Sequence, residues 1–343
     1  MKKGNIIKVL IIIALIIILG IIIKMYIDSS TETVTNNSVK ERPSMSENKE
    51  KETSAEDVDK GETVNSKEIN LSEYSTNLTI TEEGTYTLTG SFTNSVIVNA
   101  SGEVTLILDG VNIESTETAA IANGTTNPLT IVLAENSENN LSDGGSSEYD
   151  GCIFSYGKLT IEGKGTLNVN GKQEEGEGLA TKSADLIINS GTINVTSQDD
   201  GLNTGGSGGS IIINGGTIFI KANGDGIDSN GSFTLNGGNV YTIGSARGGD
   251  AGIDTDEGFV FNGGEIIAIG SDMLEKPEST SEQKSACFEL KSTVNSGSKV
   301  EVKNEQGNTV ASFEAKEDFK TLIISNEIIS DETYSVYVDG EKL

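Results

Sequence analysis

Histidine and tryptophan are absent from the 343-residue sequence, which contains only three prolines and two cysteines. The absence of histidine excludes histidine general bases, Ser/His and Cys/His nucleophile pairs and histidine metal sites. A bound metal is therefore expected to be a hard cation held by oxygen ligands. The cysteines, Cys152 and Cys287, match no zinc or redox spacing. We expect two separate thiols, at least one of them buried, although the sequence leaves a disulfide open.

Basic residues are also scarce, because 24 lysines and arginines accompany 52 aspartates and glutamates, for a formal net charge of -28. Such a surface repels nucleic acid and anionic lipid and attracts cations. We therefore expect no nucleic-acid partner. An acidic partner is expected to bind only through a bridging metal or a local basic patch.

Long apolar runs are limited to one, from Val9 to Ile23, which follows Lys2, Lys3 and Lys8. The run falls short of the roughly 20 residues that span a bilayer, but it lengthens if Lys8 reaches the interface. The lysine bias predicts a membrane-anchor helix, a signal anchor over residues 1–27 with its N-terminus inside. A cleaved signal peptide is the alternative. Both place the rest of the chain outside the cytoplasm, tethered at the cell surface or secreted.

Residues 28–68 are polar and charged, so we expect a disordered stalk. From Ile69 onward, short apolar runs alternate with glycine-rich turns. A pattern of strand, Asn, small residue, Gly and strand recurs in LIINSGTINV (186–195), IIINGGTIFI (211–220), FTLNGGNVYT (233–242) and FVFNGGEIIA (259–268). The asparagines stand at positions 189, 214, 236 and 262, so they are spaced by 25, 22 and 26 residues. This period is typical of a β-solenoid.

Alternate positions in the first strand of each unit are apolar, which predicts one buried face. Stacked coils would form an amide ladder in which each side chain bonds the turn of the next coil, from Asn189 through Asn214 and Asn236 to Asn262. Asn-Gly also favours hairpins, so a meander of hairpins is the alternative. Each unit nevertheless carries a third element, GLAT, GLNT, GIDS or GIDT, which a three-sided coil requires. We predict an all-β parallel β-helix over 69–278 with a β-rich C-terminal cap over 279–343.

Acidic residues recur at matching offsets in the third elements. One outward column is predicted to contain Ala180, Asn203, Asp228 and Asp254. Two charges about 5 Å apart repel by about 3.5 kcal/mol at an effective dielectric near 20. Calcium relieves such repulsion, because it accepts about six to eight oxygen ligands in flexible geometry. The predicted ligands are Asp199, Asp200, Asn203, Asp225, Asp228, Asp250, Asp254 and Asp256. Plain turns are the alternative, since Asp-Gly and Asn-Gly are favoured turn pairs.

Two bases and one aromatic residue are candidates for contact with sugar. Lys182 and Arg247 flank the acidic repeat, where they would meet the carboxylates of a uronate polymer, and solvated charges are the alternative. Tyr241 is predicted to face outward and to stack on a sugar ring, or else to be an ordinary surface aromatic.

The anchor, the stalk, the serial NGGT, NGGN and NGGE turns, DGIDSNG (225–231), GGDAGIDTD (248–256) and TYSVYVDG (333–340) together resemble bacterial carbohydrate-binding β-helix proteins related to pectate lyases. The resemblance covers about residues 69–340. It implies a right-handed parallel β-helix, bound calcium and affinity for plant polysaccharides of cellulosic or pectic type. It also implies that the acidic repeat, from Asp199 to Asp254, forms the calcium site.

A pectate lyase removes the proton α to a uronate carboxyl with a base, while calcium acidifies that proton. The sequence shows no basic cluster around Lys182 or Arg247 to grip an acidic polymer, so we favour a monomeric, non-catalytic, calcium-dependent polysaccharide binder. A lyase acting by β-elimination remains an alternative. A surface adhesin without sugar affinity is another, and the absence of tryptophan platforms favours it.

Overall fold

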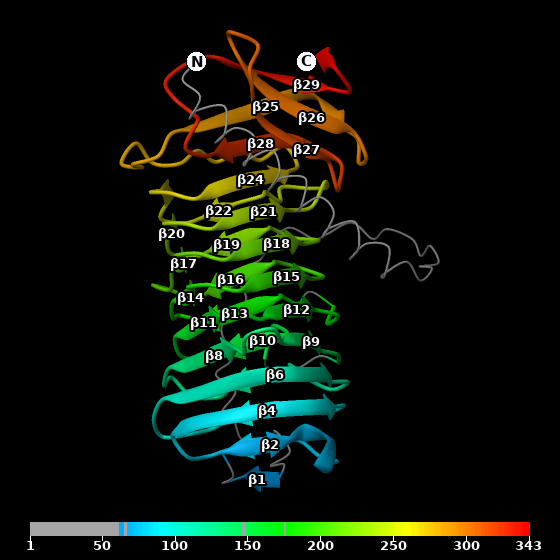
Figure 1. Cartoon of the computed structure of the whole chain (residues 1–343), viewed down its shortest axis with the longest axis vertical. Helices are drawn as coiled ribbons and strands as arrows, with labels where there is room; N and C mark the ends of the chain where they lie inside the picture. Colours follow the sequence, from blue (N-terminus) through cyan, green and yellow to red (C-terminus); the bar gives the residue numbers. More distant parts are fainter. Residues whose placement is uncertain (1–61, 65–66, 146–148, 175) are drawn as a thin grey trace, which may run out of the picture.

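The computed structural model describes residues 62–64, 67–145, 149–174 and 176–343, which form a tall stack of β-coils with a cap at one end (Figure 1). The coils pair in parallel, so the predicted all-β parallel solenoid is confirmed and the hairpin meander is wrong. The right hand of the coil stays a prediction. In the described residues the one helical element is the 3-10 turn η1 (Leu71–Glu73).

Sheet A is the face built from the third element of each repeat. It has nine strands and includes GLAT, GLNT, GIDS and GIDT in successive coils. Its strands are β1 (Glu62–Val64), β3 (Leu78–Ile80), β5 (Val96–Val98), β7 (Ile121–Asn123), β10 (Ile153–Ser155), β13 (Leu179–Lys182), β16 (Leu202–Gly205), β19 (Ile227–Ser229) and β22 (Asp254–Thr255).

Sheet B supplies the other two faces, with two strands in most coils, and it continues into the cap. Its strands are β2 (Glu68–Asn70), β4 (Gly84–Phe92), β6 (Val104–Glu114), β8 (Leu129–Leu133), β9 (Glu138–Ser142), β11 (Leu159–Gly163), β12 (Thr166–Asn170), β14 (Leu186–Ile188), β15 (Thr192–Thr196), β17 (Ile211–Ile213), β18 (Thr217–Lys221), β20 (Phe233–Leu235), β21 (Asn239–Ile243), β23 (Phe259–Phe261), β24 (Glu265–Gly270), β25 (Ser285–Val294) and β28 (Phe319–Ser325).

The interior of the coils is filled by aliphatic and phenylalanine side chains from alternate strand positions. In the first sheet-B strand of successive coils, Leu186 pairs with Ile211, which pairs with Phe233, which pairs with Phe259, and all four are buried. Because like residues stack on like residues, one continuous core runs along the solenoid, and the residues between them point outward.

The predicted asparagine ladder is present at the bend between the two sheet-B strands. Asn214 Nδ2 donates to Asn189 Oδ1 over 2.9 Å, Asn236 to Asn214 over 2.8 Å, and Asn262 to Asn236 over 2.9 Å. Each amide bonds the next amide and not the next turn, so that detail of the prediction is wrong. The reason is that an amide carries both a donor and an acceptor, so identical stacked groups satisfy one another.

The C-terminal region caps the last coil. Strand β28 pairs antiparallel with β24 and covers the edge that a further coil would otherwise occupy. A four-stranded antiparallel sheet packs beside it, made of β26 (Lys299–Asn304), β27 (Thr309–Glu314), β29 (Tyr334–Val338) and β30 (Glu341–Lys342). Lys221 of β18 forms an ion pair with Glu317 of the cap.

The predicted anchor (1–27) and most of the predicted stalk (28–68) lie outside the described residues. Strands β1 and β2 fall at the end of that stalk range, so parallel pairing begins earlier than Ile69. No helix in the described part is long and apolar enough to cross a membrane. Cys152 is buried, Cys287 is partly buried and neither forms a disulfide.

We predict that Asn236→Ala lowers the free energy of unfolding by about 1–2 kcal/mol, because it removes one donated and one accepted amide bond from the ladder. Chemical denaturation of the folded domain measures this. Asn170→Ala is the control, since Asn170 is an exposed asparagine of β12 whose side chain bonds none of the described residues. Equal losses in the two variants would contradict a stabilising ladder.

Candidate functional site

The glycine of the repeated acid-Gly pair is required by packing. It sits where the chain enters sheet A, and a Cβ at Gly201 would overlap Cγ2 of Ile220, while one at Gly226 would overlap Oγ1 of Thr242. Neither glycine has a positive φ, so close approach between coils selects it. Packing explains the glycine but leaves the type of the preceding residue free. An acid stands there in three successive coils, at Glu177, Asp200 and Asp225.

The outward column predicted on sheet A is present. Ala180 pairs with Asn203, Asn203 with Asp228, and Asp228 with Asp254 in consecutive strands. Paired residues in adjacent strands lie about 4.8 Å apart along the stack. The repeat therefore brings carboxylates of neighbouring coils together on the outer face, as the alignment of the third elements predicts.

Hydrogen bonds join this column to the acids that precede the glycines. Asn203 Nδ2 donates to Asp200 Oδ2 over 2.9 Å and to Asp228 Oδ2 over 3.2 Å. The backbone N–H of Asp225 donates to Asp200 Oδ1 over 2.7 Å, and that of Ala251 donates to Asp225 Oδ1. These two bonds join neighbouring coils, so they differ from the local side-chain bonds within a turn on which the turn interpretation rests.

The most closely packed acids are Glu177, Asp199 and Asp200, each of which offers a carboxylate oxygen within 4.8 Å of the others. Glu177 and Asp200 are each only 8% exposed. The Oε2 atom of Glu177 is buried and has no hydrogen-bond partner among the described residues. Burial and, second to it, the nearby carboxylate of Asp150 together raise the pKa of Glu177 to about 10. An all-oxygen group with an unsatisfied buried carboxylate oxygen fits a hard cation.

The carboxyls of Asp225 and Asp228, in the next coil of the stack, are also unfavourable places for a negative charge. Burial first, and then the charges of Asp200 and Asp254, raise the pKa of Asp225 to about 8 and that of Asp228 to about 7. Among the described residues no lysine or arginine forms an ion pair with Asp225 or Asp228. At neutral pH the group must therefore hold protons or a cation.

Three predicted ligands lie outside these two groups. Asp250 and Asp254 are half-buried, and Asp256 is exposed. Glu275, which belongs to a loop beyond the repeats, reaches the same end and accepts from Thr255 through Oε2, over 3.2 Å from the backbone N–H and 3.0 Å from Oγ1. No repeat pattern marks Glu275. Glu177 is not among the predicted ligands, although the repeat marks its position, because EGLA (177–180) aligns with DGLN (200–203).

The predicted sugar contacts are placed differently. Lys182 and Arg247 are exposed, and within the described part neither side chain forms an ion pair or hydrogen bond. Tyr241 is only 4% exposed, so the prediction that it faces solvent is wrong. It does point out of the coil, but the cap covers it: its ring lies 5.8 Å from that of Phe219 and 5.7 Å from that of Phe313. Tyr241 therefore anchors the cap and offers no platform for sugar.

Comparison with known proteins gives one family. Residues 74–324 match the family model of the carbohydrate-binding domain-containing protein. A protein of that description from Acetivibrio thermocellus is 35% identical over 127 residues, which are 34% of this chain and 43% of the relative, so the matched part spans less than half of that protein. A solved structure titled polysaccharide lyase-like protein from C. thermocellum, gadolinium derivative, has a TM-score of 0.46 and 27% identity, and covers 60% of this chain and 88% of its own.

We predict that the metal-free protein loses stability as pH rises. Carboxyls with folded pKa values above the usual value of about 4 keep protons in the folded state that the unfolded chain has released, so the free energy of unfolding falls between about pH 4 and the folded pKa. With chelator present, we expect the free energy of unfolding to fall by on the order of 2 kcal/mol between about pH 5 and pH 8. Thermal unfolding at each pH measures this change. Calcium should abolish most of it.

The matched variant for this measurement is Asp225→Asn with Asp228→Asn, which removes two of the three carboxyls with strongly raised pKa values and leaves Glu177. Its stability should depend less on pH and less on calcium than that of the unmodified protein. An unfolding curve of the unmodified protein that is the same with chelator and with calcium at about pH 8 would argue against a cation at this edge.

Proposed function

The chain belongs to the family of carbohydrate-binding domain-containing proteins, and on that basis we propose that it is a non-catalytic, calcium-dependent polysaccharide-binding protein that acts outside the cell. The ligand we propose is a plant cell-wall polysaccharide of cellulosic or pectic type. The lysine-flanked apolar run at the N-terminus supports export and a tether to the membrane. The observation that carries calcium dependence is the buried Oε2 of Glu177, which lies beside Asp199 and Asp200 and accepts no hydrogen bond from any residue that the structure describes.

Glu177, Asp199 and Asp200 would hold the first ion, because their oxygens already converge. A second ion would bind on the outward column, where negative charge accumulates near Asn203, Asp225 and Asp228. Bound calcium supplies positive charge at an otherwise acidic edge, where it can accept a hydroxyl or carboxylate oxygen of a sugar. The hydrogen bonds from Asn203 and from the main chain of the next coil keep the carboxylates in place for this role.

A lyase would additionally need a base held beside the metal and the substrate. The two candidate bases, Lys182 and Arg247, are exposed. Their side chains form no ion pair or hydrogen bond with any described residue that would orient them. We therefore keep binding without catalysis as the proposal.

We predict that the protein sediments with insoluble cellulose or pectate in calcium and that chelator weakens this binding at least tenfold. The variant Asp200→Asn with Asp228→Asn should bind at least tenfold more weakly in calcium, because it removes two of the carboxylates that would hold the ions. Depletion of protein from the supernatant measures the affinity.

The control is Asp109→Asn with Glu305→Gln, which makes the same change in net charge at exposed positions away from the acidic edge. It should bind normally. Binding that persists in chelator would refute calcium dependence. Release of an unsaturated product from polygalacturonate, seen as ultraviolet absorbance, would instead identify a lyase.

A further inference from the structure

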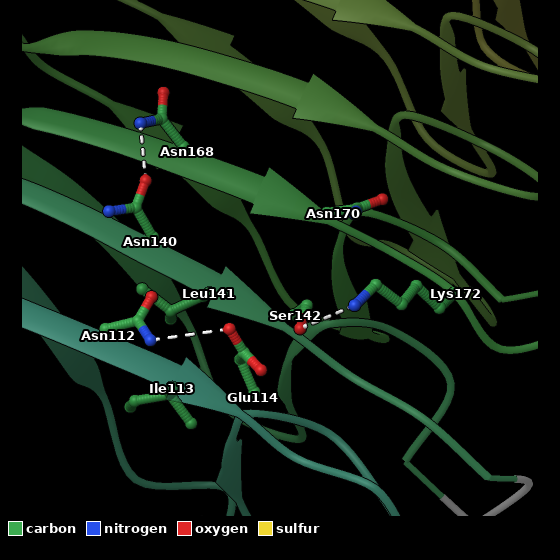
Figure 2. Close-up of a pocket in the computed structure, with 9 residues that line it drawn as sticks. All are labelled: Asn112, Ile113, Glu114, Asn140, Leu141, Ser142, Asn168, Asn170 and Lys172. Atoms are coloured by element: carbon green, nitrogen blue, oxygen red, sulfur yellow. Dashed lines mark hydrogen bonds between the residues drawn. The ribbon is translucent and has the colours of Figure 1, made fainter. Parts of the chain in front are cut away.

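A polar groove crosses the outer face of the N-terminal half of the solenoid, on the ends of strands β6, β9 and β12 (Figure 2). Its floor is made by side chains from three successive coils and its volume is about 210 Å³. Asn112, Asn140 and Asn168 line it in order along the stack, and Lys172 lies to one side of this column, beside Ser142. None of these residues belongs to the acidic edge described above.

The groove follows one column of the solenoid. Asn112 pairs with Asn140, Asn140 with Asn168, and Asn168 with Asn194, so one amide per coil faces outward in register. The same column continues as Phe219, Tyr241 and Ile267, which are packed under the C-terminal cap. The switch from amide to apolar residues coincides with the limit of the cap. The amide part of the column is therefore the part that remains open to a ligand.

Hydrogen bonding along the amide column is incomplete at the groove. Asn194 Nδ2 donates to Asn168 Oδ1 and Asn168 Nδ2 donates to Asn140 Oδ1, each over 2.8 Å. The ladder then stops, because no hydrogen bond joins Asn140 to Asn112 in the described structure, although the two pair in register. The Nδ2 donors of Asn140 and the side-chain amide of Asn170 bond no other described residue. Unused donors and acceptors thus face the groove on neighbouring coils.

Hydrogen bonds fix the Lys172 side of the groove. The backbone N–H of Lys172 donates to Asp143 Oδ1 and Gln173 Nε2 donates to Asp143 Oδ2 over 2.7 Å, with Asp143 only 1% exposed. Lys172 Nζ donates to Ser142 Oγ over 3.1 Å. A site whose polar groups are already fixed loses little freedom when a ligand binds.

The charge of the lining selects the chemistry of the ligand. Lys172 and Glu114 are the charged residues of the lining, and their charges cancel. The polar groups between them are neutral amides and a hydroxyl, which suit sugar hydroxyls because each can both donate and accept. A polyuronate would meet Glu114 and the acidic surface of the whole protein without a compensating basic patch.

We propose that this groove binds a neutral, extended β-linked glycan whose chain runs along the solenoid axis, so that successive sugars meet Asn112, Asn140 and Asn168. Coils repeat about every 4.8 Å, which is close to the advance per sugar in such a chain. One amide per coil can therefore bond one sugar after another. The inference rests on the proposed polysaccharide binding, but it assigns the contact to a surface other than the acidic edge.

The test is the variant Asn112→Ala with Asn140→Ala in the full chain. Soluble cellohexaose is titrated into the protein, and binding is measured by calorimetry and by NMR chemical-shift changes. We expect the affinity to fall about tenfold, since two hydrogen bonds to neutral groups are lost. The matched control is Asn214→Ala with Asn236→Ala, which breaks the other asparagine ladder at a different corner of the coil. It should lower stability but leave the affinity within about twofold.

The acidic-edge variant Asp200→Asn with Asp228→Asn separates the two proposals. If it abolishes binding while the groove variant binds normally, the groove inference is wrong and the proposed calcium-dependent function stands. If the groove variant alone loses cellohexaose, the groove is supported. If the unmodified protein binds neither cellohexaose nor any insoluble polysaccharide, both proposals fail. Wild-type binding to polygalacturonate but not to cellohexaose overturns the groove inference alone.

Discussion

The structure depends on the stacking of equivalent residues from one coil onto the next. Parallel pairing keeps the register, so each outward side chain lies about 4.8 Å from the equivalent side chain of the next coil. Apolar residues gain a continuous core from this arrangement, and amides gain a ladder in which each bonds the next. Carboxylates gain nothing from stacking, because like charges repel at that spacing. A column of acids on such a fold therefore needs protons, main-chain donors or a cation.

Three kinds of residue column lie on the outer surface of the coils: asparagine, acidic and aromatic. Asparagine columns stabilise the bends and line the groove of the N-terminal coils. The acidic column occupies sheet A near the C-terminal end, where the main chain of the next coil satisfies part of the negative charge. Aromatic residues of the second sheet-B strand accept the cap. Each kind of column differs from the others in residue type and leaves the backbone unaltered.

Much of the fold and part of the candidate site could be predicted because the repeat is local. The period of the Asn-Gly bends and the alternation of apolar residues predict the coil, and the offset of each acid from its inward Leu or Ile predicts the Asn203–Asp228–Asp254 column. Two residues are not predicted by the repeat, for different reasons. Glu275 comes from a loop outside the repeat, and the pattern around Tyr241 shows the direction of its side chain but not the cap that covers it.

The solenoid, its registers and the accumulation of acid along one edge can be read from the amino-acid sequence, since they follow from residues a fixed distance apart in the chain. What each column faces depends on the packing of the whole molecule. Whether an outward residue meets water, another coil or the cap depends on contacts between segments far apart in sequence, such as Tyr241 with Phe313. The same is true of burial, which raises the pKa of Asp228 above that of an exposed aspartate and leaves Glu177 Oε2 without a hydrogen bond in the described part of the chain.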